Sequence, residues 1–216
     1  MDGNQRWSKQ NNKNLKEGYL AGLEKLYEII KFCINEEIQH LTVYALSTEN
    51  ISRPSVDVIY NLIKNKYKKL LNKINQDEKV KINIIGENKN LPPLILNILN
   101  EIISKTKHSN ALNLNIAFNY GTDHEIIHIL KSAIKDEVKT KNISLDLIKK
   151  YMYLNKSPDP NILIRTGGYQ RLSNFLLLNL KYTELYFTKT LWPDLTTEEI
   201  KSYIKDYSNI KKNYGL

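Results

Sequence analysis

Short runs of apolar and β-branched residues alternate with long segments of helical periodicity along this chain of 216 residues. The short runs predict strands at 40–46, 80–86, 112–118 and 161–165, with a last strand-like piece at 184–187. Strands that are separated by helices pair in parallel, because each helix carries the chain back across the sheet. The alternation therefore predicts an α/β fold with a central, mostly parallel sheet that is flanked by helices.

The segments between the strands predict helices, and the residues before about 14 predict an opening loop. The predicted helices cover 14–37, 56–75, 91–106, a stretch from about 123, a short piece at 173–180, and 196–207. Thr196 or Thr197 is suited to cap the last of them. No internal repeat or long linker interrupts the pattern, so we expect one domain over residues 1–216.

Composition limits the environments that suit the chain. No apolar run approaches the length that crosses a bilayer, and no secretory signal is visible, so we expect a cytoplasmic protein. A single cysteine, Cys33, excludes a disulfide framework and a cysteine metal cluster. Because Cys33 lies in an apolar helical pattern, it predicts a buried core thiol.

The formal charge of +9 and the sequence pI of about 9.3 favour anionic partners. Much of that charge is scattered lysine, which a solvated basic surface would also explain. Arginine is scarcer and more informative. The sequence has four arginines, each beside a turn rich in Gly, Pro, Asn or Ser: Arg6, Arg53, Arg165 and Arg171.

Polar residues gather after three of the predicted strands, where ligands bind in open α/β sheets. They are Ser47, Glu49, Asn50 and Arg53; then Asn119, Tyr120 and Gly121; then Arg165, Gly167, Gly168, Arg171, Ser173 and Asn174. Chance explains one such loop more easily than three at the same sheet edge. The pattern predicts a ligand site there.

The segment IRTGGYQRLSN (164–174) is the most specific of these loops. Arg165 ends a strand, the glycine pair lets the chain reverse, and Arg171 and Ser173 are expected to open a helix. Two guanidiniums, a hydroxyl and a helix N-terminus predict an anion site, most naturally for a diphosphate. The alternative is a pair of surface arginines near a flexible turn.

A diphosphate in a catalytic site usually brings Mg²⁺, which needs carboxylate oxygens. Asp2 is a candidate ligand because it lies in a turn with Gly3 and Arg6. Glu184 is a second candidate because it interrupts an apolar run. Each alone would also fit a surface carboxylate.

Several other chemistries lack support in the sequence. The four histidines show no metal-ligand spacing, and no G-x-S-x-G elbow, Walker A loop or G-x-G-x-x-G fingerprint is present. These absences argue against hydrolase, P-loop and dinucleotide-binding functions.

Four segments together resemble the cis-prenyltransferases, the undecaprenyl diphosphate synthases and their relatives. They are MDGNQRW, LTVYALSTENISRP, LNIAFNYG and IRTGGYQRLSNFLL with the following YTELYF and LWPDL. They occur in the family's order and span nearly the whole chain. The resemblance implies that an allylic diphosphate, usually farnesyl diphosphate, is condensed repeatedly with isopentenyl diphosphate into a long cis-polyprenyl diphosphate.

The resemblance also implies roles for individual residues. The opening loop, formed by Asp2, Gly3, Asn4, Gln5, Arg6 and Trp7, cradles the allylic diphosphate. Asp2 is implied to be catalytic, because it positions Mg²⁺ and helps the diphosphate leave. Isopentenyl diphosphate is held by Arg165, Arg171 and Ser173, with Glu184 as a further metal-side carboxylate. Residues of the STEN segment, Ser47, Glu49 and Asn50, bind substrate near the reacting carbons, with Asn50 catalytic. Arg53 belongs to a mobile lid and binds a substrate phosphate when the lid closes.

The family further implies an apolar tunnel between the sheet and two helices, a homodimer, and peripheral membrane contact for product release. The helix at 56–75 and the run after it, LPPLILNILNEII, are expected to line the tunnel. Bulky Leu112 at its floor and small Ala45 favour a long product.

Departures from the family's pattern keep other functions open. The family's first strand is absent, so the true start lies upstream of Met1, or the loop is held only by its neighbours and Asp2 is mobile. Leu15, Tyr19 and Asp123 replace an Arg, a His and an Arg of the family. A non-catalytic partner subunit is therefore the main alternative. A nucleic-acid-binding domain rests on net charge alone, and no nucleic acid partner is expected.

Overall fold

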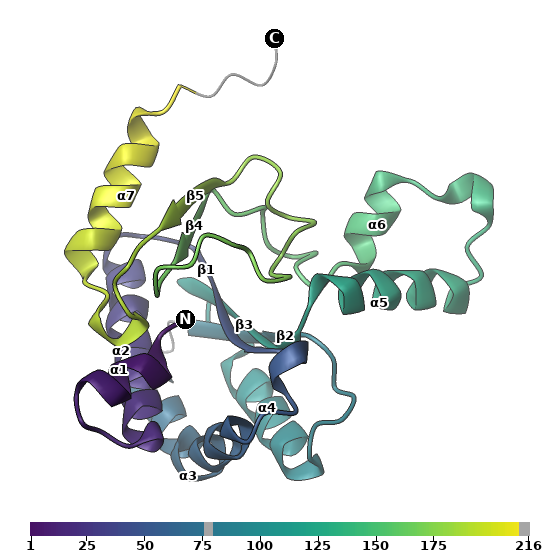
Figure 1. Ribbon diagram of the computed structural model, residues 1–216. Helices are drawn as coiled ribbons and strands as arrows, with labels where there is room; N and C mark the ends of the chain where they lie inside the picture. The colour runs from purple at the N-terminus through teal and green to yellow at the C-terminus, as the bar shows by residue number, and fades with distance from the viewer. Residues whose placement is uncertain (76–79, 212–216) are drawn as a thin grey trace. The chain divides into compact units, whose positions relative to one another are not determined.

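The computed structural model describes residues 1–75 and 80–211 (Figure 1). The chain divides into two compact units. The first unit consists of Met1–Phe32, Asp159–Arg171 and the segment from Leu180 onward, and the second consists of Cys33–Pro158 and Leu172–Asn179. The predicted α/β class with parallel pairing is confirmed. The described strands lie in a three-stranded and a two-stranded sheet, where the sequence predicted a single central one.

The second unit contains the three-stranded sheet, in the order β1 (His40–Ser47), β3 (Leu112–Tyr120), β2 (Val80–Ile85). Both neighbours run parallel to β3, which is the central and most buried strand. Leu112, at its start, is completely buried. The polar side chain of Asn115 tolerates burial because its amide donates to Thr42 and its oxygen accepts from Asn83.

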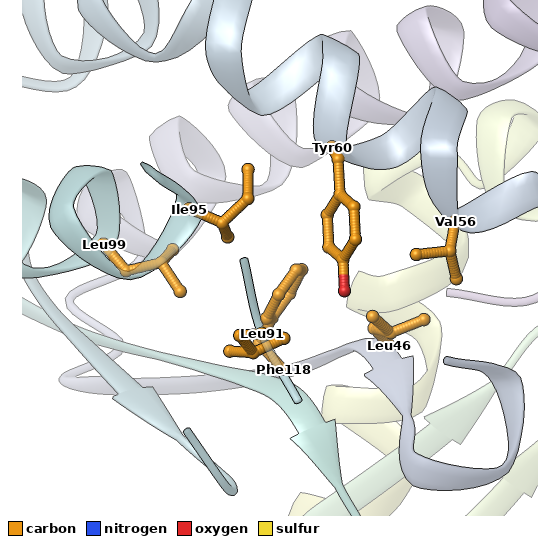
Figure 2. Packing of buried hydrophobic residues seen from close by; sticks show 7 residues of the cluster. All are labelled: Leu46, Val56, Tyr60, Leu91, Ile95, Leu99 and Phe118. Atoms are coloured by element: carbon orange, nitrogen blue, oxygen red, sulfur yellow. The ribbon is translucent and has the colours of Figure 1, made fainter. Parts of the chain in front are cut away.

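Two helices of the second unit, α3 (Ser55–Asn75) and α4 (Pro93–Thr106), pack against each other, and their apolar faces meet the side chains of β1 and β3. A proline opens α4, as the sequence predicts, because its missing N–H has no partner in the first turn of a helix. Figure 2 shows the ring of Tyr60 reaching from α3 toward Leu46 and Phe118. This apolar cluster is the part of the core that the sequence assigned to the tunnel.

The helices α5 (Thr122–Lys135) and α6 (Leu145–Tyr151) lie side by side in the same unit (Figure 1). The helix α6 was not predicted, because it is short and follows a lysine-rich stretch that is typical of a solvated connector. The signal for α6 is its cap: the Ser144 hydroxyl accepts a hydrogen bond of 3.2 Å from the Leu147 N–H.

The first unit begins with α1 (Asn4–Gln10) and α2 (Leu15–Asn35). The last residues of α2, from Cys33 onward, belong to the second unit. The prediction of a loop up to residue 13 is therefore wrong for α1. The helix α2 starts with a capping box, in which the main-chain N–H groups and side chains of Asn14 and Glu17 bond reciprocally.

The remaining elements of the first unit are β4 (Ile162–Arg165), β5 (Glu184–Phe187), the short η3 (Trp192–Asp194) and α7 (Thr197–Asn209). The strands β4 and β5 pair in parallel from Ile162 with Glu184 to Arg165 with Phe187. Thr196 caps α7 by accepting from the Glu199 N–H at 3.1 Å, which decides between the two predicted caps.

The short helix predicted at 173–180 is wrong. Three residues of that segment, Ser173, Asn174 and Leu176, have φ angles of 49°, 61° and 51°. Left-handed backbone at three positions within four residues cannot continue a right-handed helix. The apolar run FLLL suggested a helix, but the chain forms turns there instead.

The single cysteine lies in the core of the protein, as the sequence predicts. Cys33 is buried, and desolvation raises the pKa of its thiol to about 12, so it behaves as a small apolar core residue. Across the described ranges, no helix combines the length and the apolarity that a bilayer crossing needs.

Replacing Ile95, which is completely buried in the cluster of Figure 2, with alanine should lower the free energy of unfolding by about 2–5 kcal/mol. The substitution removes apolar contacts and leaves a cavity. The matched control is Leu94→Ala on the preceding residue of α4, which is 52% exposed and should cost much less. Denaturant unfolding measures both, and equal losses would contradict the packing described here.

Candidate functional site

The main chain of Asp2 is fixed by two segments of the first unit that are distant in sequence. Its N–H donates to the Thr166 hydroxyl at 3.0 Å, and that hydroxyl donates to the Asp2 carbonyl at 2.9 Å. The Trp192 N–H donates to the same carbonyl at 3.0 Å. Neighbours at the end of β4 and in η3 therefore hold the Asp2 main chain.

The Asp2 carboxylate lies between two arginines. One oxygen is 3.1 Å from Nη2 of Arg6, and the other is 3.1 Å from Nη2 of Arg165. The Arg165 side chain is only 15% exposed, while those of Asp2 and Arg6 are 38% and 39% exposed. The structure thus brings together, at the carboxyl end of β4, three of the predicted site residues.

The predicted glycine turn follows directly. Gly167 and Gly168 have φ angles of 89° and 81°, which L side chains rarely adopt. A Cβ at Gly167 would lie 2.4 Å from Nη2 of Arg6, so the turn also leaves room for that guanidinium. The Gly167 carbonyl accepts a hydrogen bond of 2.5 Å from Arg6. The N–H groups of both glycines bond to the carbonyls of Thr190 and Thr188, so they hold the turn in place.

Arg171 lies at the exposed end of the same segment. Its guanidinium is 4.2 Å from the ring centre of Tyr169, and its carbonyl accepts a hydrogen bond from Nη1 of Arg165. Because 173–180 is not helical, the helix N-terminus that was expected to bind an anion is absent from the described residues. Ser173 belongs to the second unit.

The other residues of the opening segment support α1. Gly3 is its N-cap, with a φ of 116°. The Asn4 side chain packs against Gly22 of α2. A Cβ at Gly22 would lie 2.0 Å from the Asn4 Oδ1. Trp7 donates to the Asp194 carboxylate at 2.6 Å, and Gln5 is exposed. A role of these residues in binding substrate stays a prediction.

Glu184 is at the opposite end of the two-stranded sheet from the Asp2 cluster. It pairs with Ile162, three register positions before Arg165, which is about 10 Å along a strand. Within the described residues, no group of three His, Cys, Asp or Glu side chains could hold a metal ion. Asp2 supplies the carboxylate that contacts Arg6 and Arg165. A role of Glu184 at the metal stays a prediction.

The second unit carries the other predicted residues at the end of β1. Ser47 is the last residue of that strand and is buried, and Glu49 and Asn50 form the turn η1 (Thr48–Asn50). Arg53 is exposed in the turn before α3, where the family's lid is expected. Mobility of that segment stays a prediction.

Asn174 organises this region; the sequence placed it in a predicted ligand loop but gave it no role of its own. Its side-chain amide donates to Glu49 at 3.1 Å and to Asp123 at 3.3 Å. Its main-chain carbonyl accepts from the Thr122 N–H at 3.0 Å. Partial burial raises the pKa of Glu49, but hydrogen bonds from Asn174 and from its own turn outweigh that effect and lower it. The sequence signal was an asparagine in a turn, which tolerates left-handed backbone.

The comparisons with known proteins agree on one family. A family model described as "Putative undecaprenyl diphosphate synthase" matches residues 1–215. The chain is similar to an isoprenyl transferase of Aquifex aeolicus, with 39% identity over all of this chain and 93% of that protein. It is also 35% identical to a "tritrans,polycis-undecaprenyl-diphosphate synthase (geranylgeranyl-diphosphate specific)" of Thermococcus kodakarensis, over all of this chain and 84% of the relative.

Solved structures show the same fold. A "probable undecaprenyl diphosphate synthase" of Campylobacter jejuni matches with a TM-score of 0.81 and 31% identity, over 91% of this chain and 92% of the other. A lavandulyl diphosphate synthase of Lavandula x intermedia, solved with dimethylallyl diphosphate, matches with a TM-score of 0.92 over all of this chain and 95% of that chain. At 23% identity, this second likeness bears on the fold alone.

The Thr166 hydroxyl should be essential for holding Asp2. Thr166→Val keeps the shape of this buried side chain but leaves the Asp2 N–H without its partner, so we expect a loss of about 1–3 kcal/mol in the free energy of unfolding. Thr166→Ser keeps the hydroxyl and serves as the matched control. Denaturant unfolding of both variants checks this, and a valine variant as stable as the serine variant would refute the proposed anchoring.

Proposed function

This chain belongs to the undecaprenyl diphosphate synthase, or isoprenyl transferase, family, and from that premise we propose how its residues elongate an allylic diphosphate with isopentenyl diphosphate. The family makes the chain a cis-prenyltransferase that produces a polyprenyl diphosphate. The observation that carries the proposal is the Asp2 carboxylate between Arg6 and Arg165, at the carboxyl end of a parallel strand. Such an arrangement suits a substrate with a diphosphate group and a metal ion.

The chemistry requires one bond to break and one to form. The allylic carbon–oxygen bond breaks as the diphosphate leaves, the freed carbon joins the terminal alkene carbon of isopentenyl diphosphate, and a proton is lost. Arg6 neutralises charge on the departing diphosphate, and Arg165 and Arg171 bind the isopentenyl diphosphate, with Ser173 as a further ligand. Ser47 and Asn50 take part in proton removal. Catalysis then consists of positioning and charge neutralisation.

The donor set at the cluster fits Mg²⁺. This ion is usually held by one or two carboxylates, together with phosphate oxygens of the substrate and water. Asp2 supplies one carboxylate, and the diphosphate supplies the other anionic oxygens. When bound, Mg²⁺ stabilises the charge that develops on the leaving diphosphate. The arginines on both sides of Asp2 hold its carboxylate in one orientation, through one ion pair to each carboxylate oxygen.

Farnesyl diphosphate is the allylic primer that we propose. The Thermococcus kodakarensis relative is named as specific for geranylgeranyl diphosphate, so both primers belong in the assay. Parallel reactions with each primer at equal concentration decide between them.

The growing hydrocarbon needs an apolar path, and we place it in the cluster of α3, α4, β1 and β3 shown in Figure 2. Two observations support this placement. The cluster joins the helices that the family uses for its tunnel, and Ala45 packs against it. Leu112, which the sequence assigned to the tunnel floor, is completely buried in β3. Tyr60 and Phe118 contribute aromatic bulk, with ring centres 6.4 Å apart.

A homodimer in the cytoplasm, with peripheral contact to a membrane for product release, completes the proposal. Exposed apolar side chains on α5 support a contact with another surface: Ile126, Ile127, Leu130 and Ile134. The retained Asp2, Arg165, Arg171 and Ser173 favour an active enzyme over a non-catalytic partner subunit.

Asp2→Asn should reduce turnover on the order of 100-fold or more, because the amide cannot supply the negative charge that holds Mg²⁺. The assay incubates the chain with farnesyl and isopentenyl diphosphates, with and without Mg²⁺, and measures polyprenyl diphosphate. The control is Asp57→Asn, an equivalent change at an exposed position of α3, which should leave the rate unchanged.

Near-normal turnover of the Asp2 variant would refute the role of Asp2. A wild-type chain that forms no product with either primer, but activates a second prenyltransferase, would support the non-catalytic alternative instead.

Tyr60→Ala should lengthen the product by at least one five-carbon unit, because it removes aromatic volume from the cluster that we assign to the growing chain. Chromatography of the products measures the change. Asn61→Ala, on the next and exposed residue of α3, is the control and should not change the product length. An unchanged product from a folded Tyr60 variant would place the hydrocarbon elsewhere.

A further inference from the structure

Three guanidiniums of the first unit surround one tyrosine ring. Their central carbons lie 4.2 Å (Arg171), 5.0 Å (Arg6) and 5.9 Å (Arg165) from the ring centre of Tyr169. The three arginines come from α1, from β4 and from the segment after the glycine turn. Tyr169 follows Gly168 directly, so the left-handed backbone at both glycines sets where its ring lies.

Like charges meet in this cluster. Three guanidiniums lie near the Tyr169 ring, and the Asp2 carboxylate contacts two of them. The Asp2 oxygens contact Arg6 and Arg165, whereas the Arg171 guanidinium contacts the face of Tyr169. The negative face of an aromatic ring attracts cations within about 6 Å, so the ring compensates part of the repulsion.

The same cluster borders an open space. Arg6 and Tyr169 line a pocket of about 580 Å³, and its other charged lining residues are Lys189 and Asp194. An anion beside Arg6 in this space would meet a guanidinium whose ring neighbour, Tyr169, also lies within about 6 Å of the Arg165 and Arg171 guanidiniums. Binding is stronger when the ordering of the side chains precedes it.

We propose that Tyr169 is a positioning residue of the diphosphate site, which holds Arg6, Arg165 and Arg171 together before substrate binds. The inference deepens the proposed function and rests on it, because the arginines are taken there to bind diphosphates. Tyr169 acts through the arginines, by the face of its ring rather than by its hydroxyl. Its effect therefore falls on diphosphate affinity more than on the chemical step.

The test measures binding of inorganic pyrophosphate to the full chain by calorimetry, together with KM for isopentenyl diphosphate and kcat. Tyr169→Leu removes the ring face and should weaken pyrophosphate binding about 5- to 30-fold, with a similar rise in KM and a smaller change in kcat. Tyr169→Phe keeps the face and should bind within about 2-fold of the wild type. Tyr169→Trp, with a stronger negative face, should bind at least as tightly as the wild type.

The matched control is Tyr182→Leu, the same change at a tyrosine of the first unit that is 70% exposed, and it should leave binding unchanged. A Tyr169→Leu variant that binds pyrophosphate like the wild type would overturn the inference. So would a Tyr169→Phe variant as weak as the leucine variant, because the hydroxyl would then be the active group. Thermal unfolding shows whether the leucine variant folds; if it does not, the Phe and Trp variants decide.

Arg165→Ala separates this inference from the proposed function on which it rests. If it leaves pyrophosphate binding unchanged, the arginine cluster is not the diphosphate site, and the assignment of that site fails. If it weakens binding while Tyr169→Leu does not, the site stands and only the positioning role of Tyr169 is refuted.

Discussion

The first unit depends on how Asp2 is held. Its main chain bonds to Thr166 and Trp192, and its carboxylate bridges Arg6 and Arg165. A partly exposed ion pair contributes little stability by itself. Here the two pairs share one carboxylate whose backbone is already fixed, so the cost of ordering the side chains is lower. The result is a negative charge held at one point among positive charges, which a site for Mg²⁺ and diphosphate requires.

The fold was largely predictable because its signals are local. Alternating strands and helices gave the α/β class. The cap Thr196 and the proline pair at the start of α4 marked those helix starts within a residue or two. The errors have physical causes. The helix α1 has seven residues, too few for a periodic pattern, and it is stabilised by packing of Asn4 against a glycine of α2. At 173–180 an apolar run suggested a helix, but tertiary contacts of Asn174 select left-handed turns.

The candidate site was predictable in its residue types but not in its contacts. The arginines and the glycine pair carry chemistry that can be read from sequence. Tyr169 and Thr166 belong to the same motif, but the sequence does not predict their contacts. Tyr169 lies near three guanidiniums, and Thr166 makes two hydrogen bonds to the main chain of Asp2. For Glu184 the sequence suggested a metal site shared with Asp2. The strand register places Glu184 opposite Ile162, at the other end of β4 from Arg165.

The contact between α1 and α2 limits which motions the opening segment can make. A Cβ at Gly18 would lie 2.6 Å from the Asn4 carbonyl oxygen, and Trp192 donates to the Gly22 carbonyl at 2.8 Å. Two helices whose backbones approach this closely cannot slide past each other without steric overlap. Asp2 directly precedes Gly3, the N-cap of α1, so a displacement of the Asp2 main chain would press on the contact between the two helices.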